Sequence, residues 1–538
     1  LFITLALLGI AHLVLFPVYE TNDDVGIRLI LEGRFVVGAE PSGYAYFINL
    51  VLGQVLAALY RGFPAAHWYD LAEHGAVALA ATTVFYCGIR RMRTCADATF
   101  LLLAAAIFLA TFNAIQFTIV ATLCTMVGMS AVLLAQQTAL ETREAWAVTT
   151  AGTVLIVIGA LFRLEASLLG LAVVTFIVAT NRVRRPLLKP LRPKLLVVPL
   201  AGVGLAGAAW TFHWLTLAQS PAWQEFFTFN LLRAQLSELF LARLDREILA
   251  QAYAAAGWSI AEHDLLTNWL FIDPQFFNAK NIREILAHLP TLPNTGIGQM
   301  LVLLWAALAT IPYFPLALAG VAMSTPDRRA WLSLLLSLAA AIAIVVAIST
   351  LLKPLEYRLL WPLAGGYLIA LWLLVFIHAR PAAKPVPQLA AFAAAATLIV
   401  VMAWQAADRH RHASRDAKAA IAGLALPADK VAILIGAAFP YEAAERPFAP
   451  PILQQALKAI PLGALMLAPV VAGPINAHAQ PDLATWMCTD ATVLIANPAV
   501  ISVLEAYYPR RRGYKVSLDR IFTGPSFSAY RCRRTPAS

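Results

Sequence analysis

The strongest constraint on the fold is a series of apolar runs, each close to the roughly 20 residues that a helix needs to cross a bilayer. Lys and Arg collect in the short loops between these runs, which is typical of cytoplasmic loops. Hydrophobic residues make up 60% of the 538-residue chain and charged residues 13%, and the mean hydropathy is +0.71. Soluble proteins are less apolar and more charged. The sequence therefore predicts an all-α polytopic membrane protein with about eleven transmembrane helices.

The spans are predicted from the length of each apolar run and are oriented by the basic loops. The first span leaves the cytoplasm, and the loop 181–194, rich in Lys and Arg, lies on the cytoplasmic side. The run 45–60 is expected to lie in the outer interface. The basic cluster 409–412 falls outside, against the general pattern; if the last span is misjudged, the final domain is cytoplasmic instead. The expected spans are 1–17, 68–88, 98–112, 117–136, 146–162, 167–180, 195–216, 298–323, 331–350, 359–377 and 388–406.

The composition changes near residue 413, where Asp, Pro and Gly return. We expect a transmembrane domain over 1–410, with external loops 18–67 and 217–297, and a small C-terminal extracytoplasmic α/β domain over 411–538. Strand-like and helix-like runs alternate in that domain. Cys488 and Cys532 can pair there if it is exported, with two unpaired thiols as the alternative. Strands are predicted at 431–435, 492–496 and 526–531, and helices at 452–460 and 499–507.

The formal net charge of +10 does not indicate nucleic-acid binding. Lys and Arg lie in short clusters between apolar runs, so the topology of the loops accounts for the charge. We therefore expect membrane lipids, and no nucleic acid, as partners.

An acidic pair, Asp23 and Asp24, lies where the chain leaves the first span. Carboxylates are costly near hydrocarbon, so a pair of them at a membrane boundary predicts a functional site. Thr21 is expected to cap a short helix that begins there, and Gly33 to end it. Asp24 begins an i, i+4, i+8 series with Arg28 and Glu32 that can form a ladder of ion pairs, whereas Asp23 has no local partner.

Two kinds of chemistry suit the acidic pair. A carboxylate can deprotonate an acceptor hydroxyl, and Asp23 is the better candidate because it lacks a local partner. Asp23 and Asp24 can instead share a divalent cation, for which oxygen ligands favour Mg²⁺ or Mn²⁺. The alternative is purely structural, with both residues serving only as cap and ladder groups.

Cationic residues at other external span ends are candidates for binding a phosphate. Arg163 follows one predicted span, and Lys353 and Arg358 precede another. Arg matches phosphate oxygens with a planar fork of donors, and Lys adds a point charge. The alternative is a set of internal ion pairs, Arg163 with Glu165 or Arg358 with Glu356.

The external segment 217–297 is too long for a simple connection and is rich in aromatic and acidic residues. Aromatic faces pack on sugar rings and carboxylates bind sugar hydroxyls, so this segment predicts a sugar or acceptor site. Anchoring of the aromatic residues at the membrane interface is the alternative. The predicted sugar-binding or acceptor-binding residues are Tyr44, Glu165, His263, Asp264, Trp269 and Asp273.

Several of these features occur together in one known group of membrane enzymes. The run Asn22-Asp23-Asp24, Gly33, the stretch NLVLGQVLAALYRGFP before Trp68-Tyr69, and the stretch from Asp264 to Asp273 resemble a bacterial group of multispan proteins. With the many short-looped spans and the soluble C-terminal part, they resemble the C-type (GT-C) superfamily of integral membrane glycosyltransferases.

This resemblance implies a sugar donor linked to polyprenyl phosphate or pyrophosphate, and transfer to a glycan, lipid or protein acceptor on the extracytoplasmic face. By the resemblance, Asp23 or Asp24 is the catalytic base, and Arg163 and Arg358 hold the donor phosphate. A base that activates the acceptor hydroxyl for a single displacement inverts the anomeric carbon. The implied location is the bacterial cytoplasmic (inner) membrane, with the active site outside.

Two other functions remain open. A transporter or flippase of a lipid-linked or anionic substrate also has many spans, but it typically places charges near the bilayer midplane and has duplicated halves. In this sequence the charges lie at span ends. The other possibility is a non-catalytic scaffold whose C-terminal domain binds a partner.

Overall fold

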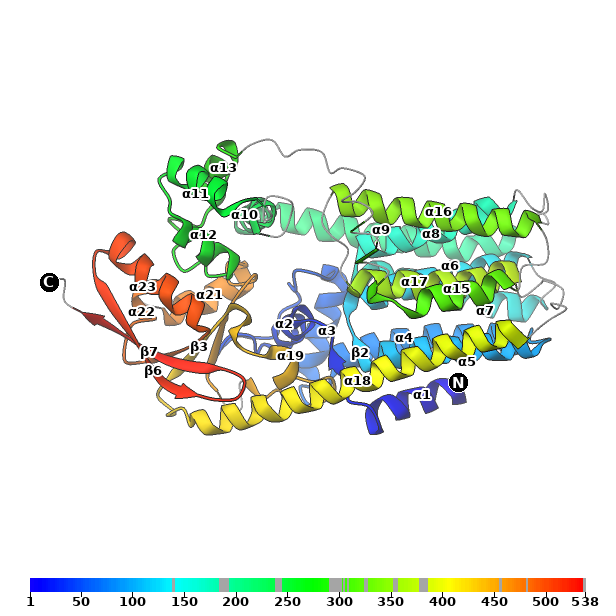
Figure 1. Cartoon of the computed structure of the whole chain (residues 1–538), viewed down its shortest axis with the longest axis horizontal. Helices are drawn as coiled ribbons and strands as arrows, with labels where there is room; N and C mark the ends of the chain where they lie inside the picture. The colour runs from blue at the N-terminus through cyan, green and yellow to red at the C-terminus, as the bar shows by residue number, and fades with distance from the viewer. Residues whose placement is uncertain are drawn as a thin grey trace.

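The structure, a computed structural model, has a helix bundle at one end and a mixed α/β unit at the other (Figure 1). Helices α2 (Asn22–Glu32) and α3 (Leu50–Gly62) lie between these two parts. The structure describes residues 1–137, 141–182, 193–237, 244–289, 302, 305–306, 309–323, 328–351, 357–376, 386–453, 457–479 and 482–535.

The predicted spans coincide with helices of the bundle. Among the described residues, six helices are long and apolar enough to cross a membrane, and five shorter helices are apolar. Much of the first half of the predicted span 298–323 lies outside the described residues. The predicted class, a polytopic helical membrane protein, is confirmed. The helices are α1 (Phe2–Leu13), α4 (Trp68–Ile89), α5 (Cys95–Asn113), α6 (Phe117–Gln137), α7 (Thr142–Phe162), α8 (Leu164–Arg182), α9 (Pro193–Ala218), α15 (Tyr313–Met323), α16 (Arg328–Leu351), α17 (Tyr357–Leu371) with the π-helical turn η2 (Trp372–Phe376), and α18 (Val386–Leu424).

Helix α3 is too short to cross the membrane. Its 13 residues rise about 20 Å, against about 30 Å for the hydrocarbon core. The helix begins at Leu50 because the side chain of Asn49 accepts a hydrogen bond from the N–H of Val51. This length fits the interfacial position predicted for 45–60.

Helix α6 forms the centre of the bundle and is 89% buried over its apolar window. It packs most closely on α7, where Gly128 and Gly152 face each other. A Cβ on Gly128 would lie 2.4 Å from the carbonyl oxygen of Gly152, and a Cβ on Gly152 would lie 2.6 Å from that of Gly128. Small residues therefore allow these two backbones to touch, as is common in membrane helix pairs.

The C-terminal unit contains a five-stranded sheet in the order β4-β3-β5-β7-β6. The buried strand β3 (Val431–Ile435) lies between β4 (Ala459–Leu462) and β5 (Thr492–Ala496) and is parallel to both. The other two strands, β7 (Ser528–Thr535) and β6 (Lys515–Thr523), are antiparallel. Helices η3 (Gly436–Ala438), α19 (Tyr441–Ala444), α21 (Pro469–His478), α22 (Leu483–Trp486) and α23 (Pro498–Arg512) complete the unit. This small α/β unit was predicted from the sequence.

One element of the unit was predicted wrongly. The predicted helix 452–460 ends in a strand, β4, whose four residues are all buried, while residues 454–456 lie outside the described part. A short buried strand reads as a continuous apolar run, which periodicity cannot distinguish from a buried helix. The predicted strands 431–435 and 492–496 match β3 and β5.

Helix α18 joins the bundle to the C-terminal unit without interruption over 39 residues (Figure 1). The predicted boundary after residue 410 falls inside this helix. The division of the chain at that residue stays a prediction.

Cys488 and Cys532 form a disulfide between the end of α22 and strand β7, the first of the two alternatives left open by the sequence. Cys87, Cys95 and Cys124 are free. We predict that maleimide labels three cysteines per chain in denaturant without reductant, and all five after reduction, as counted by mass spectrometry. In a Cys488→Ser variant, every remaining cysteine should react without reductant. Labelling of all five in the unreduced wild type would contradict the pairing.

The helices outside the bundle include a cluster from the external segment: α10 (Pro221–Ser237), α11 (Arg246–Ala255), α12 (Ile260–Thr267) and α13 (Ala279–Ala287). This cluster packs on α23 of the C-terminal unit. Arg511 donates to Glu262 at 2.5 Å, and Arg512 lies 3.1 Å from Asp273. The cluster and the C-terminal unit therefore form one assembly at the end of the bundle.

Candidate functional site

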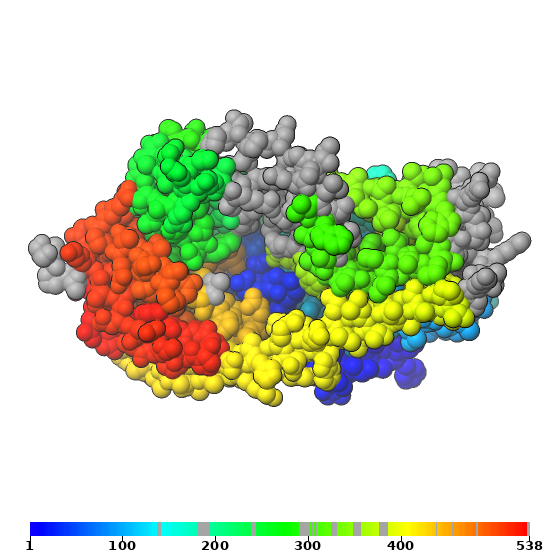
Figure 2. Space-filling view, viewed as in Figure 1, coloured from blue at the N-terminus to red at the C-terminus, as the bar shows by residue number. Residues whose placement is uncertain are grey.

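Helix α2 carries the acidic pair and lies at the junction of the bundle and the C-terminal unit. Thr21 is its N-cap residue, Asp23 and Asp24 lie in its first turn, and Gly33 ends it with a φ of 70°, as predicted. The chain enters α2 through β1 (Val18–Tyr19), which pairs with β2 (Ala114–Ile115) between α5 and α6. In Figure 2 the visible face is hollowed near its centre, and blue N-terminal residues form the floor of the hollow. Helix α2 occupies this place in the same view of the ribbon.

Asp24 is fully buried and attaches α2 to the bundle. Its Oδ1 accepts hydrogen bonds from the Tyr69 hydroxyl at 2.9 Å and from the Phe117 N–H at 3.0 Å. Its Oδ2 accepts a bond from the Thr21 hydroxyl at 3.1 Å. Burial raises the pKa of Asp24 to about 7, although the bond from Phe117 opposes the shift. These contacts define Asp24 as an anchor of the helix.

Asp23 points in a different direction and makes a long-range ion pair. Its Oδ2 accepts a hydrogen bond from Arg358 Nη1 at 2.7 Å, at the start of α17. The side chains of Asp23 and Arg358 are 25% and 18% exposed. Asp23 thus lacks a local partner, as predicted, but is paired across 335 residues of sequence. The structure brings together a predicted base and a predicted phosphate-binding residue.

Arg163 approaches α2 from the end of α7. Its Nη1 donates to the Thr118 hydroxyl at 2.8 Å, and its guanidinium lies 5.3 Å from the ring of Phe117, whose N–H binds Asp24. Glu165 is 4.0 Å from Arg163, at the limit of an ion pair, and its side chain is 74% exposed. The alternative Arg163–Glu165 pair is therefore weak. Lys353 and Glu356 lie outside the described residues.

Of the two ion pairs predicted for the ladder on α2, the structure contains one. Arg28 Nε donates to Glu32 at 2.8 Å, but no ion pair joins Arg28 to Asp24 in the described residues. Arg28 is fully buried and donates instead to the carbonyl oxygens of Arg446 at 2.7 Å and Ala449 at 2.6 Å. Asp24 is held by donors from α4 and α6, so it is not available to Arg28.

The segment 441–449 of the C-terminal unit forms one wall of the site. Asp70 of α4 accepts a hydrogen bond from the Phe448 N–H at 2.7 Å and another from the Tyr19 hydroxyl. Glu442 lies close to Asn22 and Asp23 at the start of α2. Burial raises the pKa of Glu442. A third carboxylate therefore lies at the N-terminus of α2.

Sequence reasoning missed Tyr69, Asp70, Thr118 and Glu442 as parts of this site. Tyr69 and Asp70 open the apolar span α4, where a charged residue in the first turn was the available signal. Thr118 and Glu442 carry no signal, because their position depends on contacts between distant elements.

The predicted sugar-binding residues hold the external cluster together. Tyr44 stacks on Trp223 with ring centroids 5.8 Å apart, and Arg233 lies 3.9 Å over the ring of Trp269. The remaining contacts are His263 Nδ1 with the Tyr253 hydroxyl (2.9 Å), Asp264 with Arg246 (2.7 Å), and Asp273 with the Tyr507 hydroxyl (3.0 Å) and Arg512 (3.1 Å). These interactions are structural, and the sugar-binding role of these residues stays a prediction.

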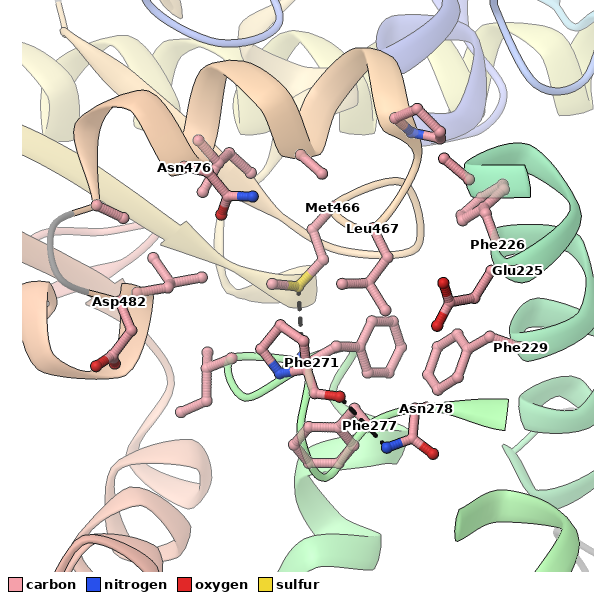
Figure 3. A pocket seen from close by; sticks show the side chains of 18 residues that line it. Glu225, Phe226, Phe229, Phe271, Phe277, Asn278, Met466, Leu467, Asn476 and Asp482 are labelled. Atoms are coloured by element: carbon pink, nitrogen blue, oxygen red, sulfur yellow. Dashed lines mark hydrogen bonds between the residues drawn. The ribbon is translucent and has the colours of Figure 1, made fainter. Parts of the chain in front are cut away.

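A cavity of about 410 Å³ lies between α10, the loop 271–278 and α21 (Figure 3). Its volume is typical of a small-molecule site. The predicted sugar-binding residues are not among its lining residues, although Asp273 lies in sequence between the lining residues Ile272 and Pro274. The labelled lining residues are Glu225, Phe226, Phe229, Phe271, Phe277, Asn278, Met466, Leu467, Asn476 and Asp482.

The acidic pair does not fit a shared divalent cation. Both oxygens of Asp24 face hydrogen-bond donors, and Asp23 is bound by a guanidinium. In the part of the chain that the structure describes, no group of three or more His, Cys, Asp or Glu side chains has a geometry that could hold a metal ion. The hydrogen-bond donors around the two carboxylates make Asp23 better suited to accept a proton than to bind a metal ion.

Comparison with known proteins gives a distant structural likeness. No family model and no curated protein matches the chain. The chain is similar to the crystal structure of ArnT from Cupriavidus metallidurans in the apo state (TM-score 0.43) and to that of ArnT bound to undecaprenyl phosphate (TM-score 0.40). Each match has 13% sequence identity and covers 98% of this chain and 96% of the other. At this identity and with TM-scores below 0.5, the likeness does not support a conclusion about this chain.

We predict that Asp24→Asn preserves the fold and changes the pH dependence of stability. The amide oxygen can accept the bonds from Tyr69 and Phe117, and the amide nitrogen can donate to the Thr21 hydroxyl. Because the pKa of Asp24 is about 7 when folded and 3.8 when unperturbed, the native state binds more protons between these values. The free energy of unfolding therefore falls as the pH rises through that window.

The contribution of Asp24 to this fall in the free energy of unfolding with rising pH should be absent in the Asp24→Asn variant. Thermal unfolding followed at pH 4.5 and 7.5 in detergent measures it, and Asp416→Asn, an exposed carboxylate on α18, is the control. An unchanged decline in the Asp24 variant would show that Asp24 is ionised throughout.

We also predict that Arg28→Met weakens the junction of α2 with the C-terminal unit. The substitution leaves a nearly buried Glu32 without its cation and should lower the free energy of unfolding by about 3–5 kcal/mol. The free energy of unfolding should fall less in the double variant Arg28→Met/Glu32→Leu. It should fall by less than about 1 kcal/mol in Arg246→Met, which removes an exposed ion pair. Unfolding midpoints and tryptic release of the C-terminal unit measure the effect. Equal losses for Arg28→Met and Arg246→Met would contradict it.

Proposed function

We propose that the chain is a membrane glycosyltransferase that takes a sugar from a polyprenyl-phosphate donor and passes it to an extracytoplasmic glycan, lipid or protein acceptor. The observation that carries this proposal is the half-buried Asp23–Arg358 pair at the junction of α2 and α17. A carboxylate and a guanidinium at one membrane boundary supply a base and a phosphate-binding group together. The resemblance of the Asn22-Asp23-Asp24 region to GT-C enzymes agrees with this assignment.

The two acidic residues have separate roles in this proposal. Asp23 is partly exposed, and its Oδ1 makes no hydrogen bond with a described residue, so it can accept a proton from an acceptor hydroxyl. Asp24 is buried and its oxygens face donors, so it positions α2. Asp23 is therefore the catalytic residue and Asp24 a positioning residue.

The reaction is a single displacement at the anomeric carbon. The acceptor oxygen bonds to that carbon, its proton passes to Asp23, and the bond from the carbon to the donor phosphate oxygen breaks. A donor phosphate competes with Asp23 for the Arg358 guanidinium, and that exchange frees the carboxylate to act as base. Arg163 lies against Thr118 and Phe117 at the start of α6, next to the residue whose N–H binds Asp24, and adds positive charge for the leaving phosphate.

The sidedness of the site also belongs to the proposal. Disulfides persist in oxidising compartments, so the Cys488–Cys532 pair supports an extracytoplasmic C-terminal unit in a bacterial inner membrane. Segment 441–449 of that unit touches α2, which puts the acidic pair on the same side. The cavity between α10 and α21 then opens on the acceptor side.

We predict that Asp23→Asn reduces the transfer rate by about 10²- to 10⁴-fold, the usual contribution of a general base. Arg358→Gln should raise the KM for the donor. Arg358→Lys should raise it less, because lysine keeps the positive charge although it lacks the planar fork of donors of a guanidinium. Proteoliposomes supplied with radiolabelled polyprenyl-phosphate sugars and an envelope extract as acceptor provide the assay. Asp416→Asn is the matched control for loss of a carboxylate. Full activity of a normally inserted Asp23→Asn variant would remove Asp23 from the mechanism.

A further inference from the structure

A basic surface lies where α18 leaves the bundle beside the end of α1. Arg411, Arg415 and Lys418 are spaced i, i+4 and i+7, so they lie on one face of α18. We call these three residues the α18 basic face. Together with Phe16 and Ser414 they line a pocket of about 270 Å³.

The charge of this face is not neutralised by the protein. In the described part of the chain, no carboxylate forms an ion pair with Arg415 or Lys418, and both side chains are exposed. Asp416 follows Arg415, but adjacent residues on a helix do not face each other. Arg411 donates to the carbonyl oxygen of Val14, which is a neutral acceptor. The face therefore presents positive charge to solvent, where an anionic ligand can pair with it.

A fourth cation reinforces this charge from the C-terminal unit. The guanidinium of Arg446 lies 3.5 Å over the ring of Phe16, and Phe16 lines the pocket. Burial lowers the pKa of Arg446, and the charge of Arg411 lowers it further. Cations from two distant segments thus converge on Phe16.

Ser414 provides an independent sign of a missing ligand. Its side chain is 2% exposed, it lines the pocket, and its hydroxyl has no hydrogen-bond partner in the structure. A helical Ser or Thr usually donates to the carbonyl four residues earlier, as Thr122 and Ser130 do in α6. A buried hydroxyl without a partner is costly. A ligand oxygen in the pocket would satisfy it.

The inner end of the pocket lies close to the level expected for lipid phosphates. The exposed apolar side chains of α18 extend to Trp404, which is 48% exposed, and those of α1 extend to Val14. Trp marks the membrane interface, and the headgroup layer adds about 5–8 Å on each side. At about 1.5 Å per residue, Arg411 lies about 10 Å beyond Trp404 along the helix, at the outer edge of that layer. Arg415 and Lys418 lie about 6 and 10 Å further out, so a phosphate would reach them from the outer side of the headgroup layer.

We propose that the pocket binds the phosphate group of an anionic membrane lipid. The guanidinium groups donate to phosphate oxygens, Lys418 adds a point charge, Ser414 donates a further hydrogen bond, and Phe16 packs against the apolar part of the lipid. This site is separate from the Asp23–Arg358 pair and does not depend on the proposed transfer reaction. It also gives a role to Arg411, one residue of the basic cluster 409–412.

Lipid binding to the purified full-length chain tests the proposal. The protein is delipidated in a neutral detergent and titrated with dioleoyl phosphatidic acid or dioleoyl phosphatidylcholine, and bound lipid is counted by native mass spectrometry. We expect saturable binding of phosphatidic acid and much weaker binding of phosphatidylcholine. Arg415→Gln/Lys418→Gln should weaken binding of phosphatidic acid about thirty-fold, since each cation near an anionic lipid contributes about five-fold.

The matched control is Lys515→Gln/Arg520→Gln, which removes two exposed cations from β6 and should bind like the wild type. Ser414→Ala keeps the charge and should weaken binding several-fold, which separates a built site from general attraction. Inorganic phosphate should compete poorly, because it lacks the apolar part that Phe16 contacts. Equal binding of both lipids, wild-type binding by the α18 variant, or displacement by phosphate at concentrations equal to that of the lipid would each overturn the proposal.

Discussion

The buried guanidinium of Arg28 is the interaction on which the candidate site depends. A charge removed from water costs several kcal/mol unless its donors are satisfied. Here Glu32 supplies the counter-ion, two carbonyl oxygens of the segment 441–449 accept hydrogen bonds, and Tyr19 and His67 provide further contacts. Because the same segment carries Glu442, the C-terminal unit both stabilises α2 and forms a wall beside Asp23. The unit is thus part of the site and not an appendage.

The acidic pair shows how one turn of helix separates two roles. Adjacent residues in a helix point about 100° apart, so Asp23 and Asp24 meet different surroundings. Asp24 points into the bundle, where Tyr69 and Phe117 hold it, and its environment favours the protonated form. Asp23 points towards α17 and stays in contact with solvent. A pair that looks equivalent in the sequence is therefore asymmetric in chemistry.

Sequence patterns predicted those parts of the fold that depend on local chemistry. Apolar runs marked the spans, and the strands β3 and β5 and the Gly33 stop of α2 were found from short motifs. The i, i+4 rule predicted Arg28 with Glu32 correctly but failed for Asp24 with Arg28, because donors from α4 and α6 occupy Asp24. The Asp23–Arg358 pair spans 335 residues and the Arg28 contacts span more than 400, so no local spacing encodes them. Arg358 was nevertheless a candidate, because a cation at an external span end is costly without a role.

Positive and negative side chains lie on different sides of the candidate site. Arg358 contacts Asp23 of α2 from the start of α17, and Arg163 contacts Thr118 at the start of α6. The cavity of Figure 3 has Glu225 and Asp482 in its lining and no Lys or Arg among its described lining residues. Its wall is shared with the site, since Leu465 packs beside Gly26 of α2 while the next residue, Met466, lines the cavity. The two sides of this short segment thus differ in charge, with guanidinium groups near α2 and carboxylates in the cavity, where Arg512 lies 3.3 Å from Asp482.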